Sequence, residues 1–234
     1  MAGTMLRLYD LAGADDSLRF SPHCWRVRMA LAHKGLAVQT IPWRFTEKDR
    51  LPQPNIGMVP VLTDGDSVVH DSWKIAEYLE FRYPGSPLFG CPAARSQALL
   101  VKYWVEKALH PLMSRMILLD IWSGLHDKDK AYFRDSREKR FGKRLEDVVA
   151  DRDGARRMFR DALEPLRSML ADQSFICGVE PGFADYLLLG VFQWARCGSA
   201  YALLDDADPV ASYREQLLDL FDGLARRAPH LDAK

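Results

Sequence analysis

Short runs in which apolar and polar residues alternate predict strands in the first third of the chain. The predicted strands cover residues 5–9, 37–42, 60–63 and 67–69. The last two flank Asp64-Gly65-Asp66, which is typical of a hairpin turn. Apolar positions spaced three and four residues apart predict helices over 22–34 and 72–83. The predicted order of elements is therefore β-α-β-loop-β-β-α.

The pattern changes at PGSPLFGCPA, residues 84–93, where three prolines and two glycines indicate a linker. Beyond this linker almost every apolar residue follows helical spacing. The predicted helices cover residues 92–123, 128–150, 154–172, 183–198 and 210–227. We therefore expect two domains, a small α/β domain over 1–84 and an all-helical domain over 92–234.

Charge and composition argue against several classes of ligand and site. The 234 residues include 32 Lys and Arg and 32 Asp and Glu, so the formal net charge is zero and no overall basic field favours nucleic acid or an acidic membrane. The basic stretch 134–144 also contains acidic residues and reads as a solvated helix face. The four cysteines form no C-x-x-C pair, so we expect no metal site. Without a signal-peptide pattern or an apolar run of about 20 residues, we expect a soluble cytoplasmic protein.

The start of the first predicted helix, FSPHCWRVRMALAHKG, places a hydroxyl, an imidazole and a thiol within one turn. Ser21 is a favoured N-cap, and Pro22 suits the first helical position. Two readings of Ser21 remain open: a plain helix cap, or a hydroxyl that stabilises an anion at the positive end of the helix dipole. His23 and Cys24 follow on the same turn.

Two further segments of the small domain carry candidate chemistry. VPVL places Val59 before Pro60 at the start of a strand, where a cis peptide is an option. In HDSWKIAEYLE, Asp71 and Ser72 precede a helix that Ser72 is expected to cap.

These segments, in this order and followed by an all-helical domain, resemble the glutathione transferase superfamily. The resemblance implies a thioredoxin-like N-terminal domain with a glutathione site and a helical domain that completes the second-substrate site. It also implies glutathione as the cosubstrate and a homodimer. VPVL matches the cis-proline strand of that family, and DSWKIAEYL matches its acidic residue and Ser before I-x-x-Y-L.

The resemblance assigns roles to individual residues. Ser21 stands where serine-type members place the hydroxyl that hydrogen-bonds the glutathione sulfur. Val59 is expected to pair its backbone with the cysteinyl backbone of the tripeptide, beside Pro60. Asp71 and Ser72 are expected to bind the ammonium and the carboxylate of the γ-glutamyl end. For the glycyl carboxylate, Arg44, Lys48 and Arg50 remain candidates only.

The expected second-substrate pocket lies between Ser21 and the long helix that begins near Pro92. His23, Cys24 and Trp104 are its candidate lining residues. Cys24 stands three residues after the position of the reactive cysteine in cysteine-type transferases, so packing and a redox role are both open for it.

A late segment, FICGVEPGFADYLLL, matches the part of the family in which an aspartate belongs to a buried helix cap. That aspartate is Asp185 here. The family usually has Ser, Thr or Asn three residues earlier, whereas this chain has Gly182. Glycine is a tolerable N-cap, so we expect Asp185 still to reach back to the N–H of Gly182.

Two stretches of the sequence resemble particular branches of this family. SPHCWRVRMALAHKG is similar to the zeta-class run, and YFRDSREKRFGKRLEDV with SPxxWR resembles bacterial β-aryl etherases and fungal etherase-type transferases. The expected activity is attack by glutathione thiolate on an aromatic electrophile in detoxification, with β-aryl ether cleavage as a candidate reaction. The alternatives are a zeta-like isomerase and a non-catalytic binding protein that keeps the fold.

Overall fold

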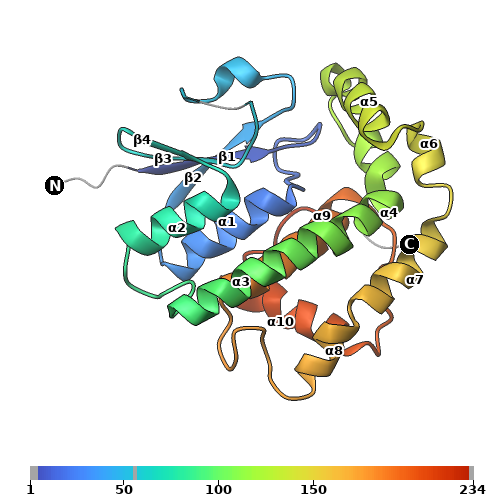
Figure 1. The fold of residues 1–234 in the computed structure, drawn as a ribbon. Coiled ribbons are helices and arrows are strands. Elements are labelled where there is room, and N and C mark those ends of the chain that lie inside the picture. The colour runs from blue at the N-terminus through green and yellow to red at the C-terminus, as the bar shows by residue number, and fades with distance from the viewer. Residues whose placement is uncertain (1–4, 55–56, 232–234) are drawn as a thin grey trace.

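The computed structural model describes residues 5–54 and 57–231. A four-stranded sheet in the order β2-β1-β3-β4 occupies the N-terminal part, with α1 and α2 against one face, and the remaining helices form a second layer (Figure 1). The strands are β1 (Leu6–Leu11), β2 (Val38–Trp43), β3 (Val61–Asp64) and β4 (Ser67–His70). The order β-α-β-loop-β-β-α is confirmed.

The register of the sheet explains why apolar and polar residues alternate along the strands. β1 runs parallel to β2 and antiparallel to β3, so that Leu8 pairs with Thr40 on one side and with Leu62 on the other. Leu8 and Leu62 are fully buried. β3 and β4 pair Asp64 with Ser67, which leaves a two-residue turn. Gly65 has a φ of 56° in that turn, a value that favours glycine.

The helices that flank the sheet are α1 (Pro22–His33) and α2 (Ser72–Arg82). The second layer consists of α3 (Pro92–Trp104), a π-helical turn (Val105–Leu109), α4 (His110–Ser123), α5 (Asp127–Phe141), α6 (Leu145–Val148), α7 (Arg152–Ala162), α8 (Glu164–Leu170), α9 (Phe183–Gly198) and α10 (Pro209–Gly223). A short 3-10 turn, Lys48–Arg50, lies in the loop after β2. No helix in the described ranges has the length and apolar character that spanning a membrane needs.

Two of the predicted helices are wrong as single elements. The helix predicted over 128–150 breaks after Phe141, because Gly142 takes a left-handed conformation that ends α5, and α6 is a separate short turn. The helix predicted over 154–172 breaks at Leu163, and Pro165 lies in the first turn of α8. The helix predicted over 210–227 ends at Gly223.

Helix α9 joins the two layers by packing along α1. At Gly190 of α9, an added Cβ would lie 2.5 Å from the carbonyl oxygen of Pro22 in the first turn of α1. No side chain larger than hydrogen fits in that space. Gly190 therefore lets the buried core helix approach the segment that carries Ser21.

The cap of α9 confirms the prediction for Asp185. Its carboxylate accepts hydrogen bonds from the N–H of Gly182 at 2.9 Å, from the N–H of Ile176 at 2.7 Å and from the hydroxyl of Tyr213 at 2.8 Å. An added Cβ at Gly182 would lie 2.7 Å from Sγ of Cys177 and 3.1 Å from the carbonyl oxygen of Leu88. Tight packing, rather than backbone conformation, explains why glycine stands at this position.

Candidate active site

A cleft of about 690 Å³ opens between the sheet layer and the helical layer. One wall comes from the segments that follow β1 and β2 and precede β3 and α2. The other wall comes from α3 to α5 and from α9. Among the residues predicted from the sequence, the cleft is lined by Ser21, His23, Val59 and Asp71.

Ser21 is the N-cap of α1. Its backbone is extended, and its Oγ accepts a hydrogen bond from the N–H of Cys24 at 3.3 Å. Only 4% of the residue is exposed, although it lines the cleft. A hydroxyl that accepts from the backbone still has its own proton to donate. Ser21 can therefore cap the helix and, with the same oxygen, donate to an anion bound in the cleft.

The peptide bond between Val59 and Pro60 is cis, which is the option that the sequence left open for this strand start. Val59 lines the cleft, whereas Pro60 is buried behind it. The cis bond directly precedes β3, and Val59 lines the same cleft as Ser21.

The prediction that Ser72 caps α2 is wrong. Asp71 is the N-cap, because its carboxylate accepts hydrogen bonds from the N–H groups of Trp73 at 2.9 Å and Lys74 at 3.1 Å. Asp71 has a φ of 68°, a value that few residues other than glycine adopt. Ser72 is the first residue of the helix and is 2% exposed. The helix start thus places the acidic side chain, not the hydroxyl, at the cap.

Beneath Ser21 lies a buried polar cluster that centres on the fully buried Arg26. The guanidinium lies 3.2 Å from Oε1 of Glu106, 3.1 Å from Nδ1 of His23 and 3.4 Å from Nε2 of His110. Burial and the charge of Arg26 hold the pKa of His23 well below its usual range. The same two causes lower the pKa of His110 to about 3. Both imidazoles are therefore neutral at physiological pH.

The helical side of this cluster sits on a π-helical turn. Glu106 and Lys107 belong to the turn Val105–Leu109, and Lys102 of α3 pairs with Glu106 at 2.9 Å. Turns of this kind occur mostly as single turns inside α-helices, and frequently at functional sites. The turn carries the carboxylate that neutralises Arg26 at the floor of the cleft.

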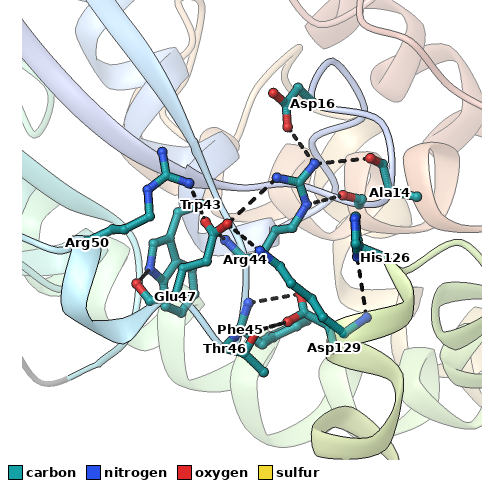
Figure 2. A network of polar contacts seen from close by, with 12 residues as sticks. Ala14, Asp16, Trp43, Arg44, Phe45, Thr46, Glu47, Arg50, His126 and Asp129 are labelled. Atoms are coloured by element: carbon teal, nitrogen blue, oxygen red, sulfur yellow. Dashed lines mark hydrogen bonds and ion pairs between the residues drawn. The ribbon is translucent and has the colours of Figure 1, made fainter.

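The loop after β2 is fastened to α5 by one buried carboxylate. Asp129 is fully buried and accepts from the N–H of Phe45 at 3.1 Å, the N–H of Thr46 at 3.0 Å and the hydroxyl of Thr46 at 2.6 Å (Figure 2). These three hydrogen bonds hold Phe45 in the wall of the cleft. Phe45 then packs against Tyr132 and Phe133 of α5, at ring-centroid distances of 6.2 and 5.6 Å.

The same loop engages two of the three residues considered for the glycyl carboxylate. Arg44 donates to the carbonyl oxygens of Gly13 at 3.1 Å and Ala14 at 3.0 Å and pairs with Asp16 at 2.5 Å (Figure 2). Arg50 pairs with Glu47 at 2.6 Å. Both arginines therefore stabilise the loop itself.

Comparison with known proteins identifies the family. The model of the glutathione S-transferase N-terminal domain matches residues 17–87, and the model of the C-terminal domain matches residues 96–202. The chain belongs to the glutathione S-transferase superfamily. Both parts of the predicted fold, the thioredoxin-like N-terminal domain and the helical C-terminal domain, are thereby confirmed.

Among curated relatives, a stringent starvation protein A homolog from Pasteurella multocida is 32% identical over 40% of this chain and 45% of its own length. Glutathione S-transferase Z1 from Arabidopsis thaliana is 43% identical over 27% of this chain and 31% of its own length. The chain thus matches less than half the length of these relatives.

Solved structures agree on the fold over the whole chain. The crystal structure of glutathione transferase GSTFuA3 from Phanerochaete chrysosporium has a TM-score of 0.82 at 21% identity, covering 99% of this chain and 100% of that one. A glutathione S-transferase of Ceriporiopsis subvermispora, solved in complex with glutathione, has a TM-score of 0.79 at 20% identity, covering 97% and 99%. At this identity, the likeness establishes the transferase fold.

Two residues expected in the second-substrate pocket of this transferase fold lie elsewhere. Cys24 is fully buried, and burial together with the nearby carboxylate of Asp10 raises the pKa of its thiol well above the usual range. A protonated, inaccessible thiol is a packing group. Trp104, at the end of α3, packs against the core and is not among the described residues that line the cleft.

Sequence reasoning missed the buried cluster around Arg26. Lys102, Glu106 and His110 follow one another at intervals of four residues, a spacing that places them on one side of a helix. That signal was available. Arg26, in contrast, stands inside an apolar helix. Its partners Glu106 and His110 are 80 and 84 positions away, so the local sequence did not mark Arg26 as buried. Among the described residues, no group of three His, Cys, Asp or Glu side chains could hold a metal ion.

Proposed function

We propose that this chain is a glutathione transferase that uses Ser21 to stabilise the thiolate of bound glutathione for attack on an aromatic electrophile. The observation that carries the proposal is the position of Ser21, whose hydroxyl caps α1 at the edge of a cleft with an aromatic opposite wall. Glutathione binding in a homologous structure of the same fold supports it.

Each residue along the sheet side of the cleft then has a role. Val59 pairs its backbone with the cysteinyl residue of glutathione beside the cis bond to Pro60. Asp71 and the start of α2, with Ser72, take the ammonium and the carboxylate of the γ-glutamyl end. Asp71 already accepts from the N–H groups of Trp73 and Lys74, so the ligand carboxylate is bound by the N–H of Ser72 and is favoured by the partial positive charge of the helix N-terminus.

The chemical step is a displacement. The thiol of glutathione releases its proton to water, and the hydroxyl of Ser21 donates a hydrogen bond to the resulting thiolate. A sulfur–carbon bond forms at the electrophilic carbon while the bond to the leaving group breaks, and the leaving group departs with the electron pair. Holding both reactants in the cleft makes the attack effectively unimolecular. The product is a glutathione thioether.

Ether cleavage is the same displacement with a phenoxide as the leaving group. For a β-aryl ether with a carbonyl on the neighbouring carbon, the carbonyl activates the carbon that the sulfur attacks. The resemblance of residues 132–148 to etherase-type transferases motivates this reaction. We also propose that the enzyme is a cytoplasmic homodimer that acts in detoxification.

A zeta-like isomerase is the second candidate. Two plant relatives named as glutathione S-transferase Z1 and as a zeta-class glutathione S-transferase are 43% and 39% identical over their aligned segments, which supports this alternative. In an isomerase, the thiolate adds to a double bond and leaves again, so glutathione is not consumed. A non-catalytic binding protein is the third candidate, since a relative named as a stringent starvation protein A homolog aligns over 96 residues.

The deciding experiment compares Ser21→Ala with Ser136→Ala, which removes a hydroxyl from the α5 side of the same cleft. With a chlorodinitrobenzene as electrophile, Ser21→Ala should lower turnover at neutral pH about 100-fold, the value of about two pKa units. It should still be retained on glutathione-agarose, and Ser136→Ala should keep its turnover.

Three further results discriminate between the candidates. Release of phenol from an α-keto aryl ether supports ether cleavage. Turnover of maleylacetone without net loss of glutathione supports the isomerase. Failure of the wild-type chain to bind glutathione-agarose and to conjugate any electrophile contradicts both enzyme proposals and favours the binding protein.

A further inference from the structure

Helix α5 carries an arginine into the cleft without a carboxylate to neutralise it. Arg137 lines the cleft and donates to Oγ of Ser136 at 3.0 Å, but it forms no ion pair with any acid of the described residues. Arg134, one turn earlier, pairs with Glu138 and Glu146, at 2.9 Å each. The sequence neutralises one of these arginines on α5 and leaves the other with its charge available in the cleft.

The guanidinium of Arg137 is nevertheless held in place. Its central carbon, Cζ, lies 4.4 Å from the ring centroid of Phe133 and 5.1 Å from the ring centroid of Phe45. Contacts of this kind orient a guanidinium without cancelling its charge. The residue is only partly exposed, and burial lowers its pKa from the usual value. A partly buried cation held over aromatic faces is preorganised to bind an anion.

The carboxylates that line the cleft do not neutralise its aromatic end, which is formed by Phe45, Tyr132 and Phe133. Glu106 is neutralised by Arg26 and Lys102, and Asp71 is engaged in capping α2, at the opposite wall. Arg140, one turn after Arg137, also lines the cleft and forms no ion pair with the described acids. The aromatic end of the cleft therefore carries two uncompensated arginines.

We propose that the second substrate is an aromatic acid, whose ring packs against Phe45, Tyr132 and Phe133 and whose carboxylate binds Arg137, with Arg140 as a second cation. This inference rests on the proposed function, because it names the electrophile of the same reaction. Glutathione has carboxylates but no aromatic group, so a cation set among aromatic rings fits an aryl acid better than the tripeptide. The planar guanidinium can hold a carboxylate by two parallel hydrogen bonds.

The test measures binding rather than turnover. Two probes are used, the glutathione thioethers formed from a chlorodinitrobenzoic acid and from the matching benzamide, with glutathione alone as reference. Calorimetry on the wild-type chain should show that the acid conjugate binds about tenfold more tightly than the amide conjugate. This comparison needs no variant, so it does not depend on how a substitution folds.

Substitutions then identify the residue that causes the preference for the acid conjugate. Arg137→Met should abolish the preference for the acid conjugate and leave the affinities for glutathione and for the amide conjugate unchanged. Arg137→Lys should keep part of the preference because it keeps the charge. Lys139→Met, which removes an equal charge from an exposed position on the same helix, should keep all of it.

Three outcomes overturn the inference. Equal binding of the two conjugates to the wild-type chain excludes an acid site. An equal loss of affinity for glutathione and both conjugates in Arg137→Met assigns the arginine to a carboxylate of glutathione itself, while the proposed function stands. If neither glutathione nor either conjugate binds the wild-type chain, the proposed function fails, and the inference that rests on it fails too.

Discussion

Nη1 of Arg26 lies 3.1 Å from Nδ1 of His23, and Nη2 of the same side chain lies 3.4 Å from Nε2 of His110. A guanidinium can only donate hydrogen bonds, so the ring nitrogen that faces it must accept. His23 therefore carries its proton on Nε2, and His110 carries its proton on Nδ1. One buried arginine fixes both tautomers at the floor of the cleft.

The first prediction concerns this tautomer. In the wild-type chain at neutral pH, the nitrogen chemical shifts of His23 should show an unprotonated Nδ1 and a protonated Nε2, because Arg26 occupies the lone pair of Nδ1. His23→Gln provides the assignment of the signal. A protonated Nδ1, or a positively charged ring at neutral pH, would contradict the arrangement.

The second prediction concerns acid stability. His110 has a folded-state pKa of about 3, whereas an unfolded histidine has about 6.5, so the unfolded chain binds the extra proton between these values. The unfolding free energy should therefore fall as the pH drops through this window, by up to about 1.4 kcal/mol per pH unit for the fully shifted group. The charged groups that face the ring are Arg26 and Arg140, and both oppose its protonation.

Denaturant unfolding at a series of pH values checks this expectation. His110→Asn should show a smaller fall than the wild-type chain, since it lacks the titrating ring. His126→Asn, at an exposed position outside the cluster, is the matched control and should show the wild-type fall. An identical pH dependence in the wild-type chain and His110→Asn would exclude His110 as a contributor.

The third prediction concerns the tight packing at Gly182. Gly182→Ser introduces the residue type usual in the family, yet it should lower the unfolding free energy by about 1 to 2 kcal/mol, because its Cβ would crowd Cys177 and the carbonyl oxygen of Leu88. In the Cys177→Ala background, the same substitution should cost less, since the sulfur is gone. A double-mutant cycle measures this coupling. Stabilisation by Gly182→Ser in the wild-type background would show that the cap outweighs the crowding.

The sequence was most informative where local chemistry decides the structure. Alternation, the turn at Gly65, the caps at Ser21 and Asp185 and the Val59–Pro60 segment depend on neighbours within a few residues. It was less informative where two rules compete. Asp71 and Ser72 are both good caps, and only the backbone conformation at Asp71 decides between them. The break at Gly142 was missed because helical spacing of apolar residues resumes immediately afterwards.

The remainder of the site depends on contacts between distant segments. Asp129 accepts hydrogen bonds from Phe45 and Thr46, which stand 84 and 83 positions earlier in the chain. Arg26 pairs with Glu106, which stands 80 positions later. No pattern within a window of one helix marks such residues. The pocket role expected for Cys24 is wrong for the same reason, since its thiol lies beside Asp10 and Leu11 of β1 and is fully buried there.

The central claim, that Ser21 stabilises a glutathione thiolate, is tested most directly by titrating the thiol of bound glutathione. The ultraviolet absorbance of the thiolate is followed against pH, and the same titration without glutathione removes the contribution of the protein. In the wild-type complex, the thiol should titrate about two pKa units below free glutathione, and Ser21→Ala should return it most of the way. A wild-type complex whose thiol titrates like free glutathione, or a depressed pKa that survives in Ser21→Ala, would contradict the claim.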